Sequence, residues 1–308
     1  TRLVSWIRSF LSDRSFRVLV NSELSTAARI TSGCPQGTIL GCIAFILYTN
    51  SVKEVFSDAV SYKIYADDTK IYKSVNSDED HATLQKAIDD FFSWTLSLDL
   101  VLSIEKYTVL HCGRSNNRRP YFINGHQLPQ STKVRDLGVM MTPDMKFTEQ
   151  TREVVNRANR RVNFIMRSFI LRDAEVYRRL FETYVKPIIT YGLTVWNPRL
   201  KKDKALLDSI FRRFSKKVSF RCGINPCLST EFSLEVVLET TDVRMFKYLT
   251  TKTDFSSYLF DVIETRTRSE CKHRAKFRAL NDTVNNFFPW RVTRLLREAN
   301  LGKASPNL

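Results

Sequence analysis

The pattern of apolar residues changes near Phe147, and this change constrains the fold more than any other feature of the chain. Before it, short runs that alternate apolar and polar residues lie between stretches with helical spacing. After it, the spacing is almost entirely helical, with Arg and Lys on the exposed faces. The sequence therefore predicts a mixed α/β domain over residues 1–147 and a basic helical domain over residues 148–308.

The net charge of +16 is concentrated in the helical half of the chain. Residues 1–150 hold 17 Lys and Arg against 16 Asp and Glu, whereas residues 151–308 hold 31 against 16. Such an excess implies a polyanionic partner, although charge alone is equally compatible with a surface that is merely basic. Motifs must therefore decide between these two interpretations.

Composition excludes several classes of protein. A chain that is 43% hydrophobic and 26% charged is typical of a globular protein. The longest apolar run, residues 38–48, is too short to cross a membrane, so we expect an intracellular protein with no membrane partner.

The six Cys show no CxxC pairs, and the spacing of Cys222, Cys227, Cys271 and His273 matches no common zinc site. We therefore expect reduced thiols.

Local periodicity predicts most of the secondary structure. Helical spacing predicts helices over residues 3–11, 38–48, 78–98, 149–169, 175–191 and 203–220, with a less regular tail to Leu301. The helix over residues 38–48 is apolar nearly all round, so we expect it to be buried. Strand-like runs cover residues 16–20, 108–111 and 133–140, and a basic loop covers residues 114–119.

Residues 61–75, SYKIYADDTKIYKSV, predict a hairpin whose turn, Ala66-Asp67-Asp68-Thr69, carries two acids. Adjacent acids are most often solvated turn residues. Here a tight turn would bring successive carboxylates towards the same place, which a regular strand does not. Clustered carboxylates bind hard divalent cations, so Asp67 and Asp68 are candidate metal ligands for phosphoryl transfer. The small Ala66 leaves room for the end of a nucleic-acid strand.

Tyr65-Ala66-Asp67-Asp68 resembles the YxDD signature of reverse transcriptases. The resemblance continues in family order through other blocks. Residues 6–11 with Arg14, and residues 32–41 (SGCPQGTILG) followed by Phe45, Tyr48 and Asn50, resemble blocks of non-LTR retrotransposons of the jockey, CR1 and RTE type. Residues 103–113, residues 134–139 (VRDLGV), and the helical part with Tyr184, Tyr191, Trp196 and residues 211–217 also resemble this family. The similarity covers about residues 3–220.

The resemblance implies an α/β (α+β) right-hand polymerase palm with an α-helical thumb. Residues 1–147 would be a partial palm, with the nucleotide-site loop, the YADD hairpin and the primer grip, and residues 148–308 the thumb and C-terminal region. The enzyme would be an RNA-directed DNA polymerase that uses two Mg²⁺ ions, or Mn²⁺. Its partners would be an RNA template, a DNA primer, deoxynucleotides and other parts of the same polyprotein, in the cytoplasm and nucleus.

The resemblance also assigns roles to residues. Asp67 and Asp68 would hold the metal, and Lys106, otherwise an ordinary surface lysine, would help to protonate the leaving pyrophosphate. The nucleotide and template would contact Pro35, Gln36, Gly37, Tyr65 and Ala66. The phosphates of the template-primer duplex would contact Arg212, Arg213, Lys216 and Lys217, which are otherwise a solvated face. The hairpin at residues 134–139 would grip the primer strand.

The sequence departs from the family at one catalytic position. These polymerases use a third carboxylate on a strand upstream of the PQG block, and no matching stretch is present. We assign structural roles to the upstream acids Asp13 and Glu23. Ser51 stands where the family has Asp, and Cys42 where it has Pro. The chain begins with Thr, so we expect an excerpt of a longer reading frame that is inactive alone for want of the upstream aspartate.

Two other functions remain open at this point. A degenerate or host-retained remnant would only bind nucleic acid, through residues 151–308, and would synthesise no DNA. An unrelated metal-dependent phosphohydrolase would hydrolyse nucleotides without a template.

Overall fold

A computed structural model describes residues 1–113, 116–224, 234–252, 260–262, 273–275, 291, 292 and 295. The chain forms two compact units. Unit 1 is Thr1–Val109 with Ser115–Gln130, and unit 2 is Leu110–Arg114 with Ser131–Leu308. Among the described helices, none combines the length and the hydropathy needed to cross a bilayer. Part of the expected basic loop (Arg114) and two of the cysteines (Cys227 and Cys271) lie outside the described residues.

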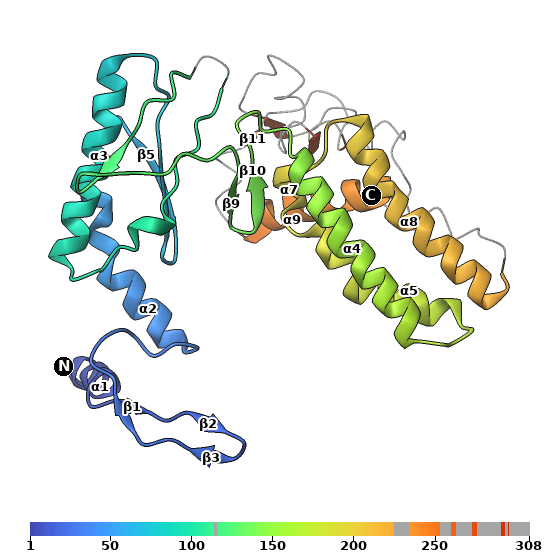
Figure 1. Cartoon of the computed structure of the whole chain (residues 1–308), viewed down its shortest axis with the longest axis horizontal. Helices are drawn as coiled ribbons and strands as arrows, with labels where there is room; N and C mark the ends of the chain where they lie inside the picture. The colour runs from blue at the N-terminus through green and yellow to red at the C-terminus, as the bar shows by residue number, and fades with distance from the viewer. Residues whose placement is uncertain are drawn as a thin grey trace. The chain divides into compact units, whose positions relative to one another are not determined.

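Unit 1 begins with a helix and two short antiparallel ladders (Figure 1). The elements are α1 (Arg2–Leu11), β1 (Ser15–Phe16), β2 (Leu19–Val20), β3 (Glu23–Leu24) and β4 (Ala28–Arg29). β1 pairs with β4 and β2 with β3, so one hairpin continues the other. The turn Asn21-Ser22 has positive φ at both residues, as a two-residue type I′ turn requires. The expected strand over residues 16–20 is therefore divided in two.

The apolar helix α2 (Ile39–Tyr48) forms as expected but is not buried. Gly41 is its one buried residue, while Ile39 is 83% exposed and Leu47 is 70% exposed. The prediction of a buried helix is wrong. Hydrophobicity favours burial of an apolar surface, but it does not specify which segment of the chain buries it. Within the described chain, that apolar surface faces outward.

The core of unit 1 lies between a long helix and a β-hairpin. The elements are η1 (Asn50–Glu54), β5 (Ser61–Tyr65), β6 (Asp68–Tyr72) and α3 (Asp78–Ser97). α3 begins with a capping box, in which the Ser77 hydroxyl accepts from the Asp80 amide and the Asp80 carboxylate accepts from the Ser77 amide. Its buried face packs into a cluster with Phe56 and Ile123, and this cluster anchors the hairpin.

The rest of unit 1 is less regular. It holds η2 (Ile104–Lys106), β7 (Phe122–Ile123) and β8 (His126–Gln127). The expected strand at residues 108–111 is reduced to one parallel bridge between Val109 and Gln130.

Unit 2 is mainly helical, and it also contains the hairpin at residues 134–141, which the sequence prediction had grouped with residues 1–147. The described elements are β9 (Val134–Asp136), β10 (Val139–Met141), α4 (Thr148–Ser168), α5 (Ala174–Tyr184), α6 (Lys186–Thr190), α7 (Leu193–Trp196), α8 (Lys201–Cys222), α9 (Leu234–Lys252), β11 (Phe260–Val262) and β12 (His273–Ala275). The single helix expected over residues 175–191 is instead two, because Pro187 lacks an amide proton and cannot continue α5.

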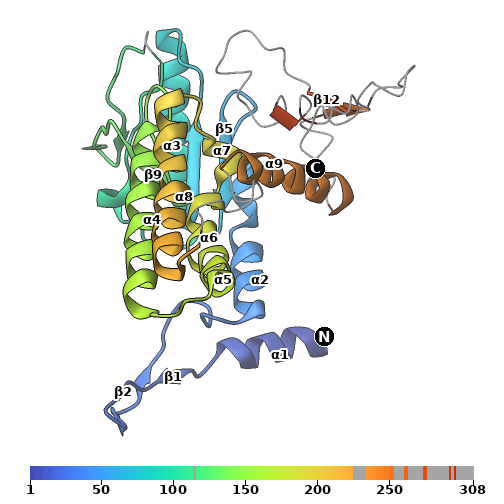
Figure 2. The same ribbon diagram turned by 90° about the vertical axis from the view of Figure 1, so that its right-hand side faces the viewer.

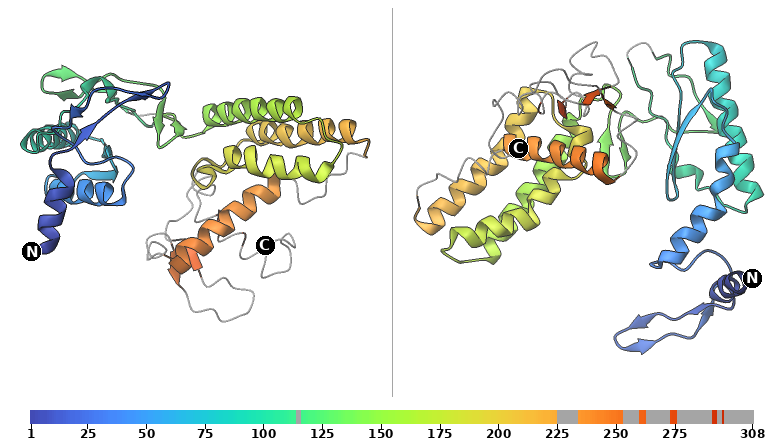
Figure 3. Two further views of the ribbon diagram at one scale, coloured as in Figure 1. Left: turned by 90° about the horizontal axis from the view of Figure 1, so that it is seen from below. Right: turned by 180° about the vertical axis from the view of Figure 1, so that it is seen from behind.

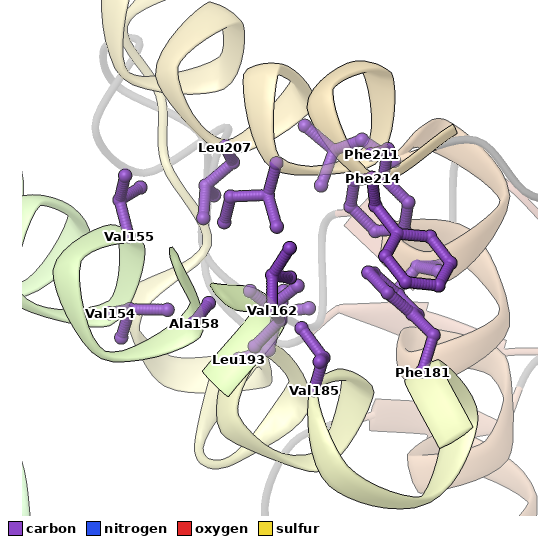
Figure 4. Packing of buried hydrophobic residues seen from close by; sticks show 14 of the residues in the cluster. Val154, Val155, Ala158, Val162, Phe181, Val185, Leu193, Leu207, Phe211 and Phe214 are labelled. Atoms are coloured by element: carbon purple, nitrogen blue, oxygen red, sulfur yellow. The ribbon is translucent and has the colours of Figure 1, made fainter. Parts of the chain in front are cut away.

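The long helices α4, α5 and α8 lie along one another and enclose the core of unit 2 (Figures 2 and 3). α4 contributes an apolar stripe, Val154, Val155, Ala158 and Val162, with helical spacing. Phe181 of α5 lies between two aromatic rings of α8, 5.3 Å from Phe211 and 4.7 Å from Phe214 between centroids (Figure 4). These tilted ring pairs join α5 to α8 within the core of unit 2.

Candidate active site and nucleic-acid interface

The two adjacent aspartates lie at the end of the β5–β6 hairpin. Tyr65 pairs with Asp68, so the turn consists of Ala66 and Asp67 alone. Asp68 is thus the first residue of β6 rather than part of a four-residue turn, which corrects the sequence prediction. Ala66 has φ +53° and Asp67 has negative φ, the pattern of a type II′ rather than a type I′ turn. The site is therefore built on a strained alanine.

Both carboxylates are exposed at this end of the hairpin. Among the described residues, neither side chain has a hydrogen-bond or ion-pair partner, so both retain their oxygen lone pairs for a ligand. Carboxylate oxygens are the donors that Mg²⁺ prefers. No group of three or more His, Cys, Asp or Glu side chains suited to a metal occurs in the described part of the chain. Asp67 and Asp68 therefore fit as two members of a larger ligand set.

The nucleotide-site loop is held against the start of α2. The Thr38 hydroxyl donates to the Pro35 carbonyl at 2.9 Å and accepts from the Gly41 amide at 3.0 Å, so one side chain caps the helix and secures the loop. A Cβ at Gly41 would lie 2.3 Å from the Pro35 oxygen, which only glycine avoids. Gly37 has φ +76°. The loop thereby presents an exposed Gln36.

Arg14 secures the other end of the same loop. Its Nη2 donates to the Gly33 carbonyl and its Nε to the Leu11 carbonyl at the end of α1, the latter at 2.9 Å. The loop is therefore fixed by a side chain at each end, and sequence reasoning had singled out only one of the two, Arg14.

Lys106 lies exposed at the end of η2. The neighbouring Ile104 is partly buried against the core of unit 1, which anchors this short helix. Among the described residues, no hydrogen bond or ion pair links Lys106 to the two aspartates. Its role is thus a prediction that geometry does not test.

A link between α2 and α3 was missed by sequence reasoning. The Trp94 indole donates to the Ser51 hydroxyl at 3.0 Å, and the Tyr48 hydroxyl donates to the Leu98 carbonyl at 2.5 Å. Ser51, where the family usually has Asp, therefore has a structural partner. These contacts join segments more than forty residues apart, so no local pattern could have found them.

The four basic residues expected to contact phosphates differ in their surroundings. Arg212 forms an ion pair with Asp208 at 3.0 Å, and Lys217 donates to Asn163 of α4 at 2.7 Å. Arg213 and Lys216 are exposed, and neither has a partner among the described residues. Arg213 and Lys216 thus have the charge most available to an anion.

The Lys217–Asn163 contact shows that this face of α8 adjoins α4. α4 and α8 run parallel, since Thr148 contacts Asp203 at one end and Arg221 contacts Met166 at the other. Residues three and four apart share a helix face. The basic residues at such spacings near the Lys217–Asn163 contact therefore lie on one surface formed by both helices. We call it the α4–α8 basic surface: Arg160, Arg167, Arg213, Lys216 and Lys217.

The two sequence stretches that form this surface contain no acidic residues. Residues 154–172 contain five Arg and no Asp or Glu, and residues 209–222 contain five Lys and Arg and no Asp or Glu. Two neighbouring helices therefore carry positive charge with no acid within these stretches to neutralise it. Such a surface suits a phosphate backbone.

Comparison with known proteins agrees with the motifs. Residues 1–141 match the sequence model of the family described as "Reverse transcriptase (RNA-dependent DNA polymerase)". A protein named "RNA-directed DNA polymerase from mobile element jockey", from Drosophila melanogaster, is 24% identical over 226 residues, 68% of this chain and 24% of that protein.

Two further relatives match in the same way. The protein of the same name from Drosophila funebris is 24% identical over 231 residues, 70% of this chain and 25% of its own length. "Probable RNA-directed DNA polymerase from transposon X-element", from Drosophila melanogaster, is 21% identical over 220 residues, 67% of this chain and 24% of its own length. The chain thus spans about a quarter of the length of these relatives. No solved structure matches it.

Proposed function

Because residues 1–141 match the sequence model of the reverse transcriptase family, we propose that this chain is part of an RNA-directed DNA polymerase of a non-LTR mobile element. The observation that carries the proposal is the pair of exposed carboxylates at the end of the β5–β6 hairpin, inside the matched segment, which have no partner among the described residues. An RNA template, a DNA primer and deoxynucleotides are the substrates, and the polyprotein works in the cytoplasm and nucleus.

In this proposal, residues 1–147 are part of a right-hand palm and residues 148–308 are the thumb and C-terminal region. The mixture of helices and small sheets in unit 1 and the helices of unit 2 are compatible with a palm and a thumb, although the hairpin at residues 134–141 lies in unit 2. The hairpin β9–β10 grips the primer strand. Arg213 and Lys216 of the α4–α8 basic surface contact duplex phosphates, with Arg212 contributing less because Asp208 neutralises it.

The reaction is attack of the primer 3′ hydroxyl on the α-phosphate of a deoxynucleotide, with pyrophosphate as the leaving group. Asp67 and Asp68 would hold two Mg²⁺ ions, which when bound stabilise charge on the attacking and leaving oxygens. Gln36 and Gly37 shape the nucleotide site, with Pro35 held by Thr38. The fixed loop orients the nucleotide, so that positioning supplies much of the rate enhancement.

Three further side chains complete the proposed site. Tyr65 pairs with Asp68 across the hairpin and fixes the direction in which β6 begins. Ala66, with one methyl group, leaves room for the primer end. Lys106 assists departure of pyrophosphate, because a positioned cation favours the charge that develops there.

The missing third carboxylate makes the described ligand set incomplete, so this chain alone is inactive in the proposal. The test is primer extension on an RNA template by this chain and by the same chain joined to the upstream part of its reading frame. Synthesis by the longer protein alone, lost in Asp67→Asn, supports the proposal. Nucleotide hydrolysis without a template would indicate a phosphohydrolase instead.

A second candidate function is that of a nucleic-acid-binding remnant without polymerase activity. The acid-free stretches of α4 and α8 favour it, because they bind phosphates whether or not unit 1 is catalytic. If neither this chain nor the longer protein extends the primer, and both still bind the duplex, this function is established and the polymerase proposal is refuted.

A further inference from the structure

We propose that Tyr191 is a positioning residue for the primer-strand hairpin, fixing the β9–β10 turn to the helices of unit 2. The inference rests on the proposed function, because it takes β9–β10 as the hairpin that touches the primer. It adds a residue to which neither the motif nor the family assigns a role here. The hairpin is thereby attached to the thumb helices and should move with them rather than with the palm.

The first contact is between Tyr191 and the turn itself. The turn, Leu137-Gly138, has φ of +43° and +82°, which is a type I′ geometry. The Tyr191 hydroxyl donates to the Leu137 carbonyl at 2.8 Å. The ring also lies against Gly138, where an added Cβ would be 3.1 Å from a ring carbon. One side chain thus holds the turn by a hydrogen bond and by packing.

A second contact interlocks with the first. Gly192, with φ +62°, follows Tyr191, and a Cβ there would lie 3.1 Å from a methyl carbon of Val139. Val139 is 6% exposed and belongs to the core of unit 2. The indole of the fully buried Trp196 donates to the Tyr191 carbonyl at 2.8 Å. Two glycines, one on each partner, therefore let strand and helix approach closely.

Two contacts with α4 complete the attachment. The Met140 amide of β10 donates to Gln150 Oε1 at 2.8 Å, and Gln150 is 3% exposed. Arg135 of β9 forms an ion pair with Glu153 at 2.6 Å. Hydrogen bonding, ion pairing and burial thus join the hairpin to α4 and to the α6–α7 junction.

Two side chains of the hairpin remain available: Leu137 at the turn, 45% exposed, and Lys133 just before β9, also exposed. An apolar side chain and a cation suit the sugar and phosphate groups of a strand rather than its base edges. Because Tyr191 holds the backbone beneath Leu137, loss of its hydroxyl should misplace this contact without removing the α4–α8 basic surface.

The experiment is photo-crosslinking with the full chain. Leu137 is replaced by p-benzoylphenylalanine, an RNA template–DNA primer duplex with a labelled primer is bound, and the crosslinked nucleotide is mapped. Tyr191→Phe removes only the hydroxyl, and Tyr184→Phe is the matched control, since Tyr184 is 51% exposed on α5. Losing one hydrogen bond should raise the undocked population of the turn about fivefold.

The expected result is a crosslink at one or two adjacent primer nucleotides in the unaltered and control proteins, and a spread over several in Tyr191→Phe, with duplex affinity within about twofold. An unchanged pattern in a folded Tyr191→Phe protein overturns the proposal. If that protein melts early, Gly138→Ala tests the same contact from the other side, and an unchanged pattern there overturns it too.

Two other outcomes separate this inference from the proposed function. If Leu137 captures no strand while the duplex still binds, the role of Tyr191 is refuted and the polymerase assignment stands. If the unaltered chain binds no duplex at all, the thumb assignment fails, and the positioning role with it.

Discussion

Replacement of Arg213 and Lys216 by Ala tests whether the α4–α8 basic surface binds nucleic acid. Both side chains are exposed and have no described partner, so each should neutralise a phosphate and release counterions. Each phosphate contact contributes about one unit to the slope of log affinity against log salt. The double variant should therefore reduce the slope by about two.

Between about 50 and 200 mM, two units of slope change the affinity ratio of the unaltered and variant proteins by roughly tenfold. The variant should bind an RNA–DNA duplex much more weakly at low salt, and the difference should narrow as salt rises. Fluorescence anisotropy with a labelled duplex at four or five salt concentrations measures it.

A control with the same change in net charge separates local contact from overall attraction. Arg178→Ala with Arg179→Ala also removes two positive charges, but both side chains pair with Glu175 on α5, at 2.6 and 3.2 Å. That control should leave the slope almost unchanged. Equal slopes for the two double variants, or no flattening in the first, would refute the assignment of this surface.

The remaining predictions concern unit 1. In the longer protein of the extension assay, Asp67→Asn should reduce primer extension by at least about 100-fold with folding unchanged, because loss of even an outer-shell partner of a metal costs about 10–100-fold; near-normal extension would contradict the metal role. Ala66→Gly should stabilise unit 1 by about 0.5–1 kcal/mol in urea unfolding, because glycine accepts φ +53° without strain; destabilisation would argue against this turn. Gly41→Ala should destabilise the nucleotide-site loop by about 1–3 kcal/mol, since its Cβ would overlap the Pro35 carbonyl; a melting temperature equal to that of the unaltered protein would contradict the packing. Hydrogen bonds from the Asn76 amide, Lys73 and Ser77 lower the pKa of Asp80 to about 2, so its stabilising contribution is present above the unfolded pKa of about 3.9 and lost as pH falls through about 2. Asp80→Asn should therefore destabilise unit 1 at pH 6 but not below pH 2, as followed by circular dichroism.

Sequence patterns predicted the elements whose causes are local. The hairpin at residues 61–75 and the helix beginning at Asp78 formed because alternation and a capping box act over a few residues. The turn residues Asn124 and Gly125, with φ of +48° and +74°, form a hairpin that the Asn-Gly pair could have predicted and that was overlooked.

Contacts between distant residues could not be predicted in the same way. The bond from Tyr191 to Leu137 spans 54 residues, and nothing in the local sequence of either indicates the other. The exposure of α2 has the same origin, because an apolar helix specifies no particular cover. In the candidate site, the residue types were predictable from motifs, whereas the hydrogen bond from Arg14 to the Gly33 carbonyl was not.

The place of Val139 in the core of unit 2 bears on how the protein should be dissected. A fragment cut at residue 147, between the proposed palm and thumb, would leave the hole that this side chain fills, at about 1.5–3 kcal/mol for a buried aliphatic group. Chimeras that exchange thumbs between related elements should therefore take the donor sequence from Ser131 onward, so that the hairpin and the helices come from the same protein.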